Sequence, residues 1–402
     1  MRNCNDRNRS LLFLRSVTHL GGSERSTLTL IRQLRKLCPV SVLDFYGCCP
    51  EYLQLMQDLQ IRYHVVMPQA RSHIIGGLSL PDRIWQMTRA LPEMCQFIRR
   101  LRRTLLTLRP RLIWCNDEKA MFTVRRAVGT QFPLAYFVRG QFSRLKWFCL
   151  PDWKRLDLIV ANNAASLRFF QPYPWARNKL AVAHNGIDFD QVQNTGPPAN
   201  NLPGLNASFK VIMPATLIPL KAHETVIRSF ARLCREVPDA LLWICGDTPN
   251  NLPRDYENHL RRLTGELNLS DRIHFLGWRS DVTAIMKCAQ AMVLASRTEG
   301  LPRSILEALA LGLPVVATRV GGIPEIIRDD REGLLIDVDD VSALHQALLR
   351  LQNPELRRRL GQAGRERVKK QFTIEAQAQK FLDGVQKAIC NQRKSPCAPV
   401  RW

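Results

Sequence analysis

Two glutamates separated by seven residues, Glu299 and Glu307, are the side chains in this sequence whose types and spacing most clearly suggest a binding site. Both lie in the stretch 295–325, ASRTEGLPRSILEALALGLPVVATRVGGIPE, and an apolar run at 289–295 precedes it. The pattern predicts a buried strand, a polar loop, a short helix and a second strand. A helix that begins just after a parallel strand offers unpaired backbone N–H groups to an anion. We therefore expect a phosphate-binding loop framed by two carboxylates that can accept hydrogen bonds from hydroxyl groups.

The N–H groups expected to face the anion are those of Arg303, Ser304 and Ile305. Ser304 followed three residues later by Glu307 also matches the capping-box pattern, in which the glutamate bonds back to the start of its own helix. In that arrangement the carboxylate of Glu307 would not be free to bind a ligand. The sequence supports both roles for Glu307 and leaves the choice open.

Strand-like apolar runs alternate with helical patterns along the whole chain, which predicts an α/β fold with two doubly wound parallel sheets, each Rossmann-like, facing a central cleft. Polar residues follow many of these runs, at the strand ends where such sheets bind ligands. The expected strands are residues 11–15, 40–45, 61–66, 111–115, 134–138, 158–161, 180–183, 210–214, 241–245, 273–276, 289–295, 315–318 and 333–336.

A chain of 402 residues is longer than one hydrophobic core usually serves, so two domains are expected. The stretch 194–206, NTGPPANNLPGLN, is rich in turn residues and lacks periodicity, and it marks the best boundary. We expect one domain at 1–200 and a second at 201–372. Residues 373–402 are expected to form a helix that packs back toward the first domain, followed by a basic tail.

The formal charge of +23 indicates an anionic partner: nucleic acid, a membrane surface or a phosphorylated substrate. No aromatic-rich basic motif or nucleic-acid-binding module is visible, so nucleic acid is not an expected partner. The twelve cysteines include no pair at metal-binding spacing and indicate reduced thiols in a cytosolic protein. The sequence has no uncharged apolar stretch long enough to span a bilayer and no export signal. The expected location is the cytoplasm, with peripheral contact at the cytosolic face of the membrane.

The helical segment at 81–108 is the strongest candidate for membrane contact. Its second half, FIRRLRRTLLTLRPR, is apolar on one face and strongly basic on the other. Such a helix can lie on anionic lipid. A basic face that is merely solvated, over an apolar face that covers the domain core, is the alternative interpretation.

The chain contains a set of short motifs: Gly21-Gly22-Ser23-Glu24-Arg25, Asn185-Gly186-Ile187-Asp188, Lys221, Gly246-Asp247, Leu276-Gly277-Trp278, Glu299-Gly300-Leu301-Pro302, Glu307-Ala308 and Gly321-Gly322-Ile323-Pro324-Glu325. In this order and spacing, the set resembles the retaining glycosyltransferases of family 4, the group 1 glycosyl transferases, which have the two-Rossmann-domain GT-B fold. The resemblance covers nearly the whole chain and is strongest at 211–337.

The resemblance implies that the first domain, 1–200, binds the acceptor and that the second, 201–372, binds a UDP- or GDP-linked sugar, used as a co-substrate without any other cofactor. It assigns the donor-sugar hydroxyls to Glu299, the ribose to Glu307 and the diphosphate to Lys221, with Gly22 allowing close backbone approach. It also implies that no metal is needed, and Asp337-Val338-Asp339 fits an ordinary turn. The remaining candidate donor-binding residues lie on the same loops: Thr216, Gly246, Arg297, Gly300, Leu301, Pro302 and Arg303.

Two positions depart from the family pattern. Relatives usually carry an arginine five residues before the lysine, where this chain has Thr216. Arg297 or Arg303 is the candidate replacement. Relatives often carry a histidine beside the donor, where this chain has Arg139. The catalytic candidates are therefore Glu299, Lys221 and Arg139, with Arg139 expected to bind phosphate. An ion pair at a domain face is the alternative role for Arg139, because an arginine cannot act as a base near neutral pH.

The expected function is therefore transfer of a sugar, with retention, from a nucleoside-diphosphate sugar to a glycan or lipid-linked acceptor in surface polysaccharide or glycolipid biosynthesis. Because of the two departures, the alternative is a degenerate transferase that acts as a binding or scaffolding protein. His184 and His223 each lie beside an apolar run and are interpreted as loop or packing residues rather than catalysts.

Overall fold

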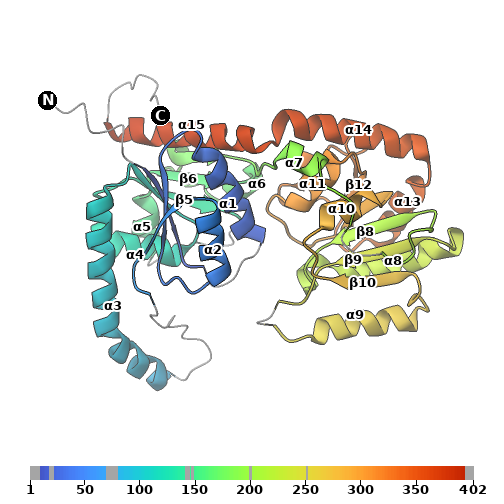
Figure 1. Cartoon of the computed structure of the whole chain (residues 1–402), viewed down its shortest axis with the longest axis horizontal. Coiled ribbons are helices and arrows are strands. Elements are labelled where there is room, and N and C mark those ends of the chain that lie inside the picture. Colours follow the sequence, from blue (N-terminus) through green and yellow to red (C-terminus); the bar gives the residue numbers. More distant parts are fainter. Residues whose placement is uncertain are drawn as a thin grey trace. The chain divides into compact units, whose positions relative to one another are not determined.

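The computed structural model describes residues 10–17, 22–68, 80–140, 145, 149–198, 202–249 and 252–393. These residues form two compact units (Figure 1). The first unit consists of the residues up to 162, residues 167–183 and those from 378 onward, and the second of residues 163–166 and 184–377. Within the described ranges no helix is both long enough and apolar enough to cross a membrane.

Seven parallel strands form the sheet of the first unit, in the order β3-β2-β1-β4-β5-β6-β7. The strands are β1 (Leu11–Arg15), β2 (Val40–Asp44), β3 (Arg62–Val65), β4 (Leu112–Cys115), β5 (Leu134–Val138), β6 (Leu158–Ala161) and β7 (Leu180–Val182). The helices are α1 (Gly22–Leu34), α2 (Pro50–Asp58), α3 (Leu80–Leu108), α4 (Glu118–Val128), α5 (Leu150–Lys154), α6 (Ala164–Leu167), η2 (Arg177–Lys179) and α15 (Ile374–Arg393), and two of these, α6 and α15, cross into the second unit.

Six parallel strands form the second sheet, in the order β10-β9-β8-β11-β12-β13. The strands are β8 (Lys210–Pro214), β9 (Leu241–Cys245), β10 (Ile273–Gly277), β11 (Ala291–Leu294), β12 (Val315–Thr318) and β13 (Leu334–Ile336). The helices are α7 (Phe189–Gln193), η3 (Pro219–Lys221), α8 (His223–Glu236), α9 (Asp255–Glu266), α10 (Val282–Lys287), α11 (Arg303–Ala310), α12 (Ile323–Ile326), α13 (Val341–Arg350) and α14 (Pro354–Gln371).

The predicted fold class, two parallel α/β sheets, is confirmed. Strands β1, β5, β6, β8, β9 and β12 begin and end at the residues expected from the sequence. They were readable because a parallel sheet covered by helices on both faces buries every side chain of its strands, which therefore appear as short continuous apolar runs. The strand expected at 289–295 is shorter, Ala291–Leu294, and the other differences are of one or two residues at strand ends.

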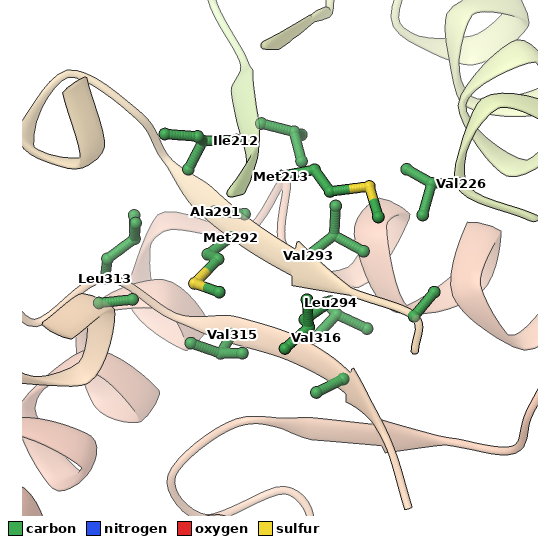
Figure 2. Packing of buried hydrophobic residues seen from close by; sticks show 14 of the residues in the cluster. Ile212, Met213, Val226, Ala291, Met292, Val293, Leu294, Leu313, Val315 and Val316 are labelled. Carbon is green, nitrogen blue, oxygen red and sulfur yellow. The ribbon is translucent and has the colours of Figure 1, made fainter. Parts of the chain in front are cut away.

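The core of the second unit is centred on β11, which lies between β8 and β12 (Figure 2). Met292 and Val293 on β11 pair in register with Val315 and Val316 on β12, and all four side chains are fully buried. Full burial of an aliphatic side chain stabilises a fold by about 1.5–3 kcal/mol. The polar loop that follows β11 therefore starts from a strand whose position is strongly constrained.

A cluster of aromatic rings holds α15 against the sheet of the first unit. The ring centroid of Phe381 on α15 lies 3.9 Å from that of Trp114 on β4 in a tilted arrangement, and the Trp114 ring stacks on Phe13 of β1 at 4.9 Å. All three side chains are buried. Helix α15 therefore contributes to the core of the first unit.

The chain passes between the two units after Asn162, Ser166, Ala183 and Gln377. Residues that follow the third crossing are bound to the second unit by hydrogen bonds. The Asn185 side-chain amide donates to the carbonyl of Leu301 (2.8 Å), and the Gly186 N–H donates to Oε1 of Gln377 (2.9 Å). Residues 184–198, which lie in the first of the two sequence-defined domains, therefore pack with the second unit.

Glu325 joins two of these crossing segments within the second unit. Its carboxylate accepts hydrogen bonds from the backbone N–H groups of Ala164 (2.9 Å) and Ala165 (3.1 Å), and its Oε2 lies 2.8 Å from Nε2 of His184. Burial alone would raise the pKa of Glu325, but the hydrogen bonds from His184 and from the two N–H groups outweigh that effect and lower the pKa. The ionised carboxylate is therefore the form that the fold stabilises.

Replacing Phe381 with alanine is expected to destabilise the first unit by about 3–5 kcal/mol, because it leaves a cavity against Trp114. Urea unfolding followed by circular dichroism measures the loss. Phe381→Leu keeps most of the volume and should cost less than half as much. Equal midpoints for the parent and Phe381→Ala would contradict a structural role for this contact.

Glu325→Gln is expected to change how stability depends on pH. Since the folded-state pKa of Glu325 lies below its unfolded value of about 4.3, the stabilisation from its charge is complete at neutral pH and is lost as the pH falls through the folded-state pKa. The Tm of the parent should therefore exceed that of Glu325→Gln at pH 7, and the gap should close as the pH falls below about 4.3. Two melting curves that stay parallel across that range would contradict the assignment.

Candidate functional site

The candidate site in the second unit is built around Glu299, on the loop between β11 and α11. Oε1 of Glu299 lies 2.5 Å from Nζ of Lys221, which ends η3 after β8, and it accepts a hydrogen bond from Oγ of Ser296 (2.7 Å). The side chains of Glu299 and Lys221 are 10% and 22% exposed. Two predicted site residues that lie 78 positions apart in the sequence are thus in direct contact, and both side chains remain partly exposed.

The capping-box interpretation of Ser304 and Glu307 is wrong. Helix α11 begins at Arg303 with Pro302 as its N-cap, so Ser304 already lies inside the first turn. Pro302 has no side-chain acceptor, and no side chain caps this end of the helix. Glu307 instead accepts a hydrogen bond from Nε of Arg303, one turn earlier (2.8 Å). The first N–H groups of α11 and the carboxylate of Glu307, which is 19% exposed, are therefore not used by a capping box.

Two glycines near this loop allow the backbone to pack where no side chain fits. A Cβ atom on Gly246, just after β9, would lie 1.9 Å from the carbonyl oxygen of Ala215, and one on Gly321 would lie 1.8 Å from that of Glu299. Gly321 also has a φ of +55°, in the left-handed region. Gly246 thus serves the contact between the ends of β8 and β9, and Gly321 supports the backbone of the Glu299 loop directly.

Neither arginine proposed to replace the missing one at Thr216 has a free guanidinium group. Thr216 itself is exposed. Arg297 pairs through Nε with Oδ2 of Asp339 (2.9 Å) and donates to the carbonyl of Pro219 (2.6 Å). Arg303 is paired with Glu307, as described above. Among the described residues, the predicted diphosphate ligand Lys221 is instead paired with Glu299, which is itself a predicted donor ligand.

The segment 337–339 forms the turn expected from the sequence. Hydrogen bonding to Arg297 is the main cause that lowers the pKa of Asp339, and α13 follows with Asp340 as its N-cap.

Across the described part of the chain, no three His, Cys, Asp or Glu side chains are grouped closely enough to hold a metal ion.

Arg139 and Gly22 belong to the first unit. Gly22 is the first residue of α1, and Gly21 lies outside the described residues. Arg139, just after β5, donates a hydrogen bond to Oγ1 of Thr27 on α1, and its guanidinium carbon lies 4.9 Å from the ring centroid of Phe137. Burial, followed by the positive charge of Arg15, lowers the pKa of Arg139 to about 9. The group is still protonated at neutral pH and cannot serve as a base.

The two histidines have different surroundings. His223, at the start of α8, is fully buried, and burial lowers its pKa to about 4. It is therefore a neutral packing residue, as the sequence suggests. His184 contacts Glu325, which the sequence did not predict. The sequence also did not predict that Ser296 donates a hydrogen bond to Glu299 or that Arg297 pairs with Asp339. For Ser296 the available signal was its position directly after a buried strand.

Comparison with known families agrees with this geometry. Residues 204–367 match the model described as glycosyl transferases group 1, and residues 20–191 match glycosyltransferase family 4. The chain is 34% identical over 174 residues to N-acetyl-alpha-D-glucosaminyl L-malate synthase of Bacillus anthracis, a match that covers 43% of this chain and 44% of the relative.

A second relative is the UDP-Gal:alpha-D-GlcNAc-diphosphoundecaprenol alpha-1,3-galactosyltransferase of Escherichia coli, 28% identical over 214 residues, which cover 51% of this chain and 53% of the relative. The matched region thus spans about half the length of each of these curated relatives. Among solved structures, Anabaena HepE in complex with UDP is similar in fold, with a TM-score of 0.77, 20% identity and coverage of 94% of this chain and 99% of that one.

The two family models together cover most of both units, and they include Lys221, Glu299 and Glu307. With two parallel α/β sheets of the GT-B type, the chain belongs to the group 1, family 4 glycosyltransferases.

Proposed function

We propose that this protein is a retaining, metal-independent glycosyltransferase. It moves a hexose from a nucleoside-diphosphate sugar to a glycan or lipid-linked acceptor in surface polysaccharide or glycolipid biosynthesis, at the cytosolic face of the membrane. The observation that carries the proposal is the contact between Lys221 and Glu299 next to the uncapped start of α11. One cation, one carboxylate and a row of backbone N–H groups provide what a sugar diphosphate requires.

In the proposed complex, the diphosphate takes the place of Glu299 as the partner of Lys221. The carboxylate of Glu299, still oriented by Ser296, then accepts hydrogen bonds from the donor-sugar hydroxyls, and Glu307 accepts those of the ribose. The N–H groups at the start of α11 face the diphosphate. These groups are already in position before the reaction, so they can stabilise a developing charge without rearrangement.

The transfer itself breaks the bond between the anomeric carbon and the diphosphate oxygen, and the electron pair leaves with the diphosphate. The acceptor hydroxyl oxygen bonds to the same carbon from the same face, which retains the configuration. Its proton passes to the departing phosphate oxygen, since Arg139 is protonated at neutral pH and cannot accept it. Lys221 stabilises the negative charge that develops on the leaving group.

Two of the matched proteins support a uridine nucleotide as the carrier. The Escherichia coli relative is named for UDP-Gal and for an undecaprenol-linked acceptor, and the HepE structure contains UDP. UDP-sugars and a polyprenyl-diphosphate sugar are therefore the first donors and acceptor to test.

Lys221→Ala is expected to reduce kcat/KM by about 10²–10³-fold, the usual cost of removing one group that stabilises transition-state charge. Glu299→Ala is also expected to reduce kcat/KM, because the donor-sugar hydroxyls lose their hydrogen-bond acceptor. A panel of UDP- and GDP-sugars is screened first by the rise in Tm and then by product formation. Adding EDTA should leave the rate unchanged, because Lys221 and α11 supply the positive potential.

Lys287→Ala provides the matched control. Lys287 ends α10 in the same unit and donates to the backbone carbonyl of Gln193 (2.9 Å), away from the Glu299 loop. Its variant should bind and react like the parent. If no sugar nucleotide raises the Tm and Glu299→Ala behaves like the parent, the proposed function is wrong.

The second candidate function, a scaffolding protein with an inactive transferase fold, is favoured by the exposed Thr216 at the place of the usual arginine. Thr216→Arg distinguishes the two. For an active enzyme we expect a severalfold lower donor KM with little change in kcat, because a second cation binds the diphosphate in both ground and transition states. Activity in Thr216→Arg together with none in the parent would support the scaffolding role.

A further inference from the structure

Helix α3 has one side that packs into the core of the first unit and another that is exposed. Phe97, Leu101 and Leu105 are buried in the core of the first unit. They recur at four-residue spacing and pack the helix against that core, next to α4. Figure 1 shows α3 along the outer flank of this unit. Within the described residues, the exposed part of the helix surface does not enter this core.

A stripe of exposed residues runs along one flank of the helix, roughly 110° around it from the buried residues. The spacing of three or four residues places Leu91, Cys95, Arg99, Arg102 and Leu106 on this flank over fifteen residues, or about 22 Å. The outer stripe of α3 consists of these five exposed residues together with exposed Arg109, which directly follows the last residue of the helix.

The two leucines in the stripe are unusually accessible for their type. Leu91 is 47% exposed and Leu106 is 40% exposed. An amphipathic helix that only covered a core would place such residues inward and polar ones outward. Here large apolar side chains lie on the inner side and also among the arginines of the outer side.

The arginines of the stripe have no acidic partner in the described structure. None of Arg99, Arg102 and Arg109 forms an ion pair with any described residue. Between positions 91 and 111 the sequence contains a single acidic residue, Glu93, two positions along the helix from Leu91 and so about 200° around it. The outer stripe is therefore a locally uncompensated positive surface.

We propose that the outer stripe of α3 docks the protein on an anionic phospholipid bilayer. The arginines contact lipid phosphates while Leu91 and Leu106 enter the boundary between headgroups and acyl chains. Arginine suits this arrangement because its aliphatic stem can lie against apolar surface while its guanidinium remains at the phosphates. The inference rests on the proposed function for its lipid-linked acceptor, and it names the surface that would bring the enzyme to that acceptor.

Nucleic acid fits this surface less well. It would also attract the arginines, but its binding gains nothing from exposed leucines, and no aromatic side chain for base stacking lies in the stripe. Binding to nucleic acid is therefore an outcome of the test that would count against the proposal.

The test is sedimentation of the full-length protein with vesicles of 30% phosphatidylglycerol in phosphatidylcholine, and with pure phosphatidylcholine. We expect binding to the anionic vesicles that weakens as salt rises, and little binding to the neutral ones. Arg99→Gln combined with Arg102→Gln should lower the partition coefficient by about thirtyfold, and Leu106→Gln by about fivefold or more.

The matched control is Arg228→Gln combined with Arg232→Gln. Both residues are exposed on α8 of the second unit, at the same spacing of about one turn, so this variant loses the same net charge. It should bind anionic vesicles within about twofold of the parent. Equal loss of binding in the stripe and control variants would show a nonspecific charge effect and overturn the proposal.

Two further measurements separate the outcomes. The Tm and the donor-induced rise in Tm should be the same in the stripe variants as in the parent, because α3 lies in the other unit from Lys221 and Glu299. A stripe variant that loses affinity for RNA or DNA but keeps its vesicle binding would also overturn the proposal. Stripe-dependent vesicle binding without a donor response would instead refute the transferase function and leave the docking surface intact.

Discussion

The contact between Lys221 and Glu299 is the interaction on which the candidate site depends. It joins the loop after β8 to the loop after β11, two neighbouring strands of the second sheet. Partly buried charges are costly to leave alone, so each of these side chains holds the other in place until a ligand arrives. A sugar diphosphate offers both of them better partners at once, a polyanion for the lysine and hydroxyl groups for the carboxylate.

The surrounding backbone explains why the Glu299 loop can hold this geometry. Gly321 has no side chain because the carbonyl of Glu299 occupies the space, and Asn185 donates to the carbonyl of Leu301 on the same loop. Glu325, four residues after Gly321, fixes the segment at 164–165 and His184. The loop is thus supported by the segments through which the chain passes between the units, so its position depends on residues far from the binding groups.

The charge distribution bears on the departure from the family pattern at Thr216. Thr216 removes one cation from the diphosphate region, and the two nearby arginines are each paired with a carboxylate, Asp339 or Glu307. Yet the chain as a whole carries +23, and a part of that excess lies on the outer stripe of α3, in the other unit. Part of the excess positive charge therefore lies on an exposed helix and not on the donor-binding loops. A charged surface of this kind fits a partner larger than a nucleotide.

The sequence by itself determined the strands, their alternation with helices and the identity of the loop residues. These are local properties: a strand buried on both faces is a short apolar run, and Gly or Pro marks its ends. It also identified the amphipathic pattern of α3, since a helical period is visible in consecutive residues.

Only the tertiary structure decided which groups meet. β8 and β11 are neighbours although β9 and β10 lie between them in the sequence, so no local pattern could predict that Lys221 contacts Glu299 or that Arg297 contacts Asp339. The start of α11 at Arg303 rather than after Ser304 was likewise set by the packing of the buried Leu301 and Pro302, which outweighed a local capping preference. The physical reason is the same in each case: sheet order is chosen by the burial of whole strands, and the polar side chains at their ends are brought together as a consequence.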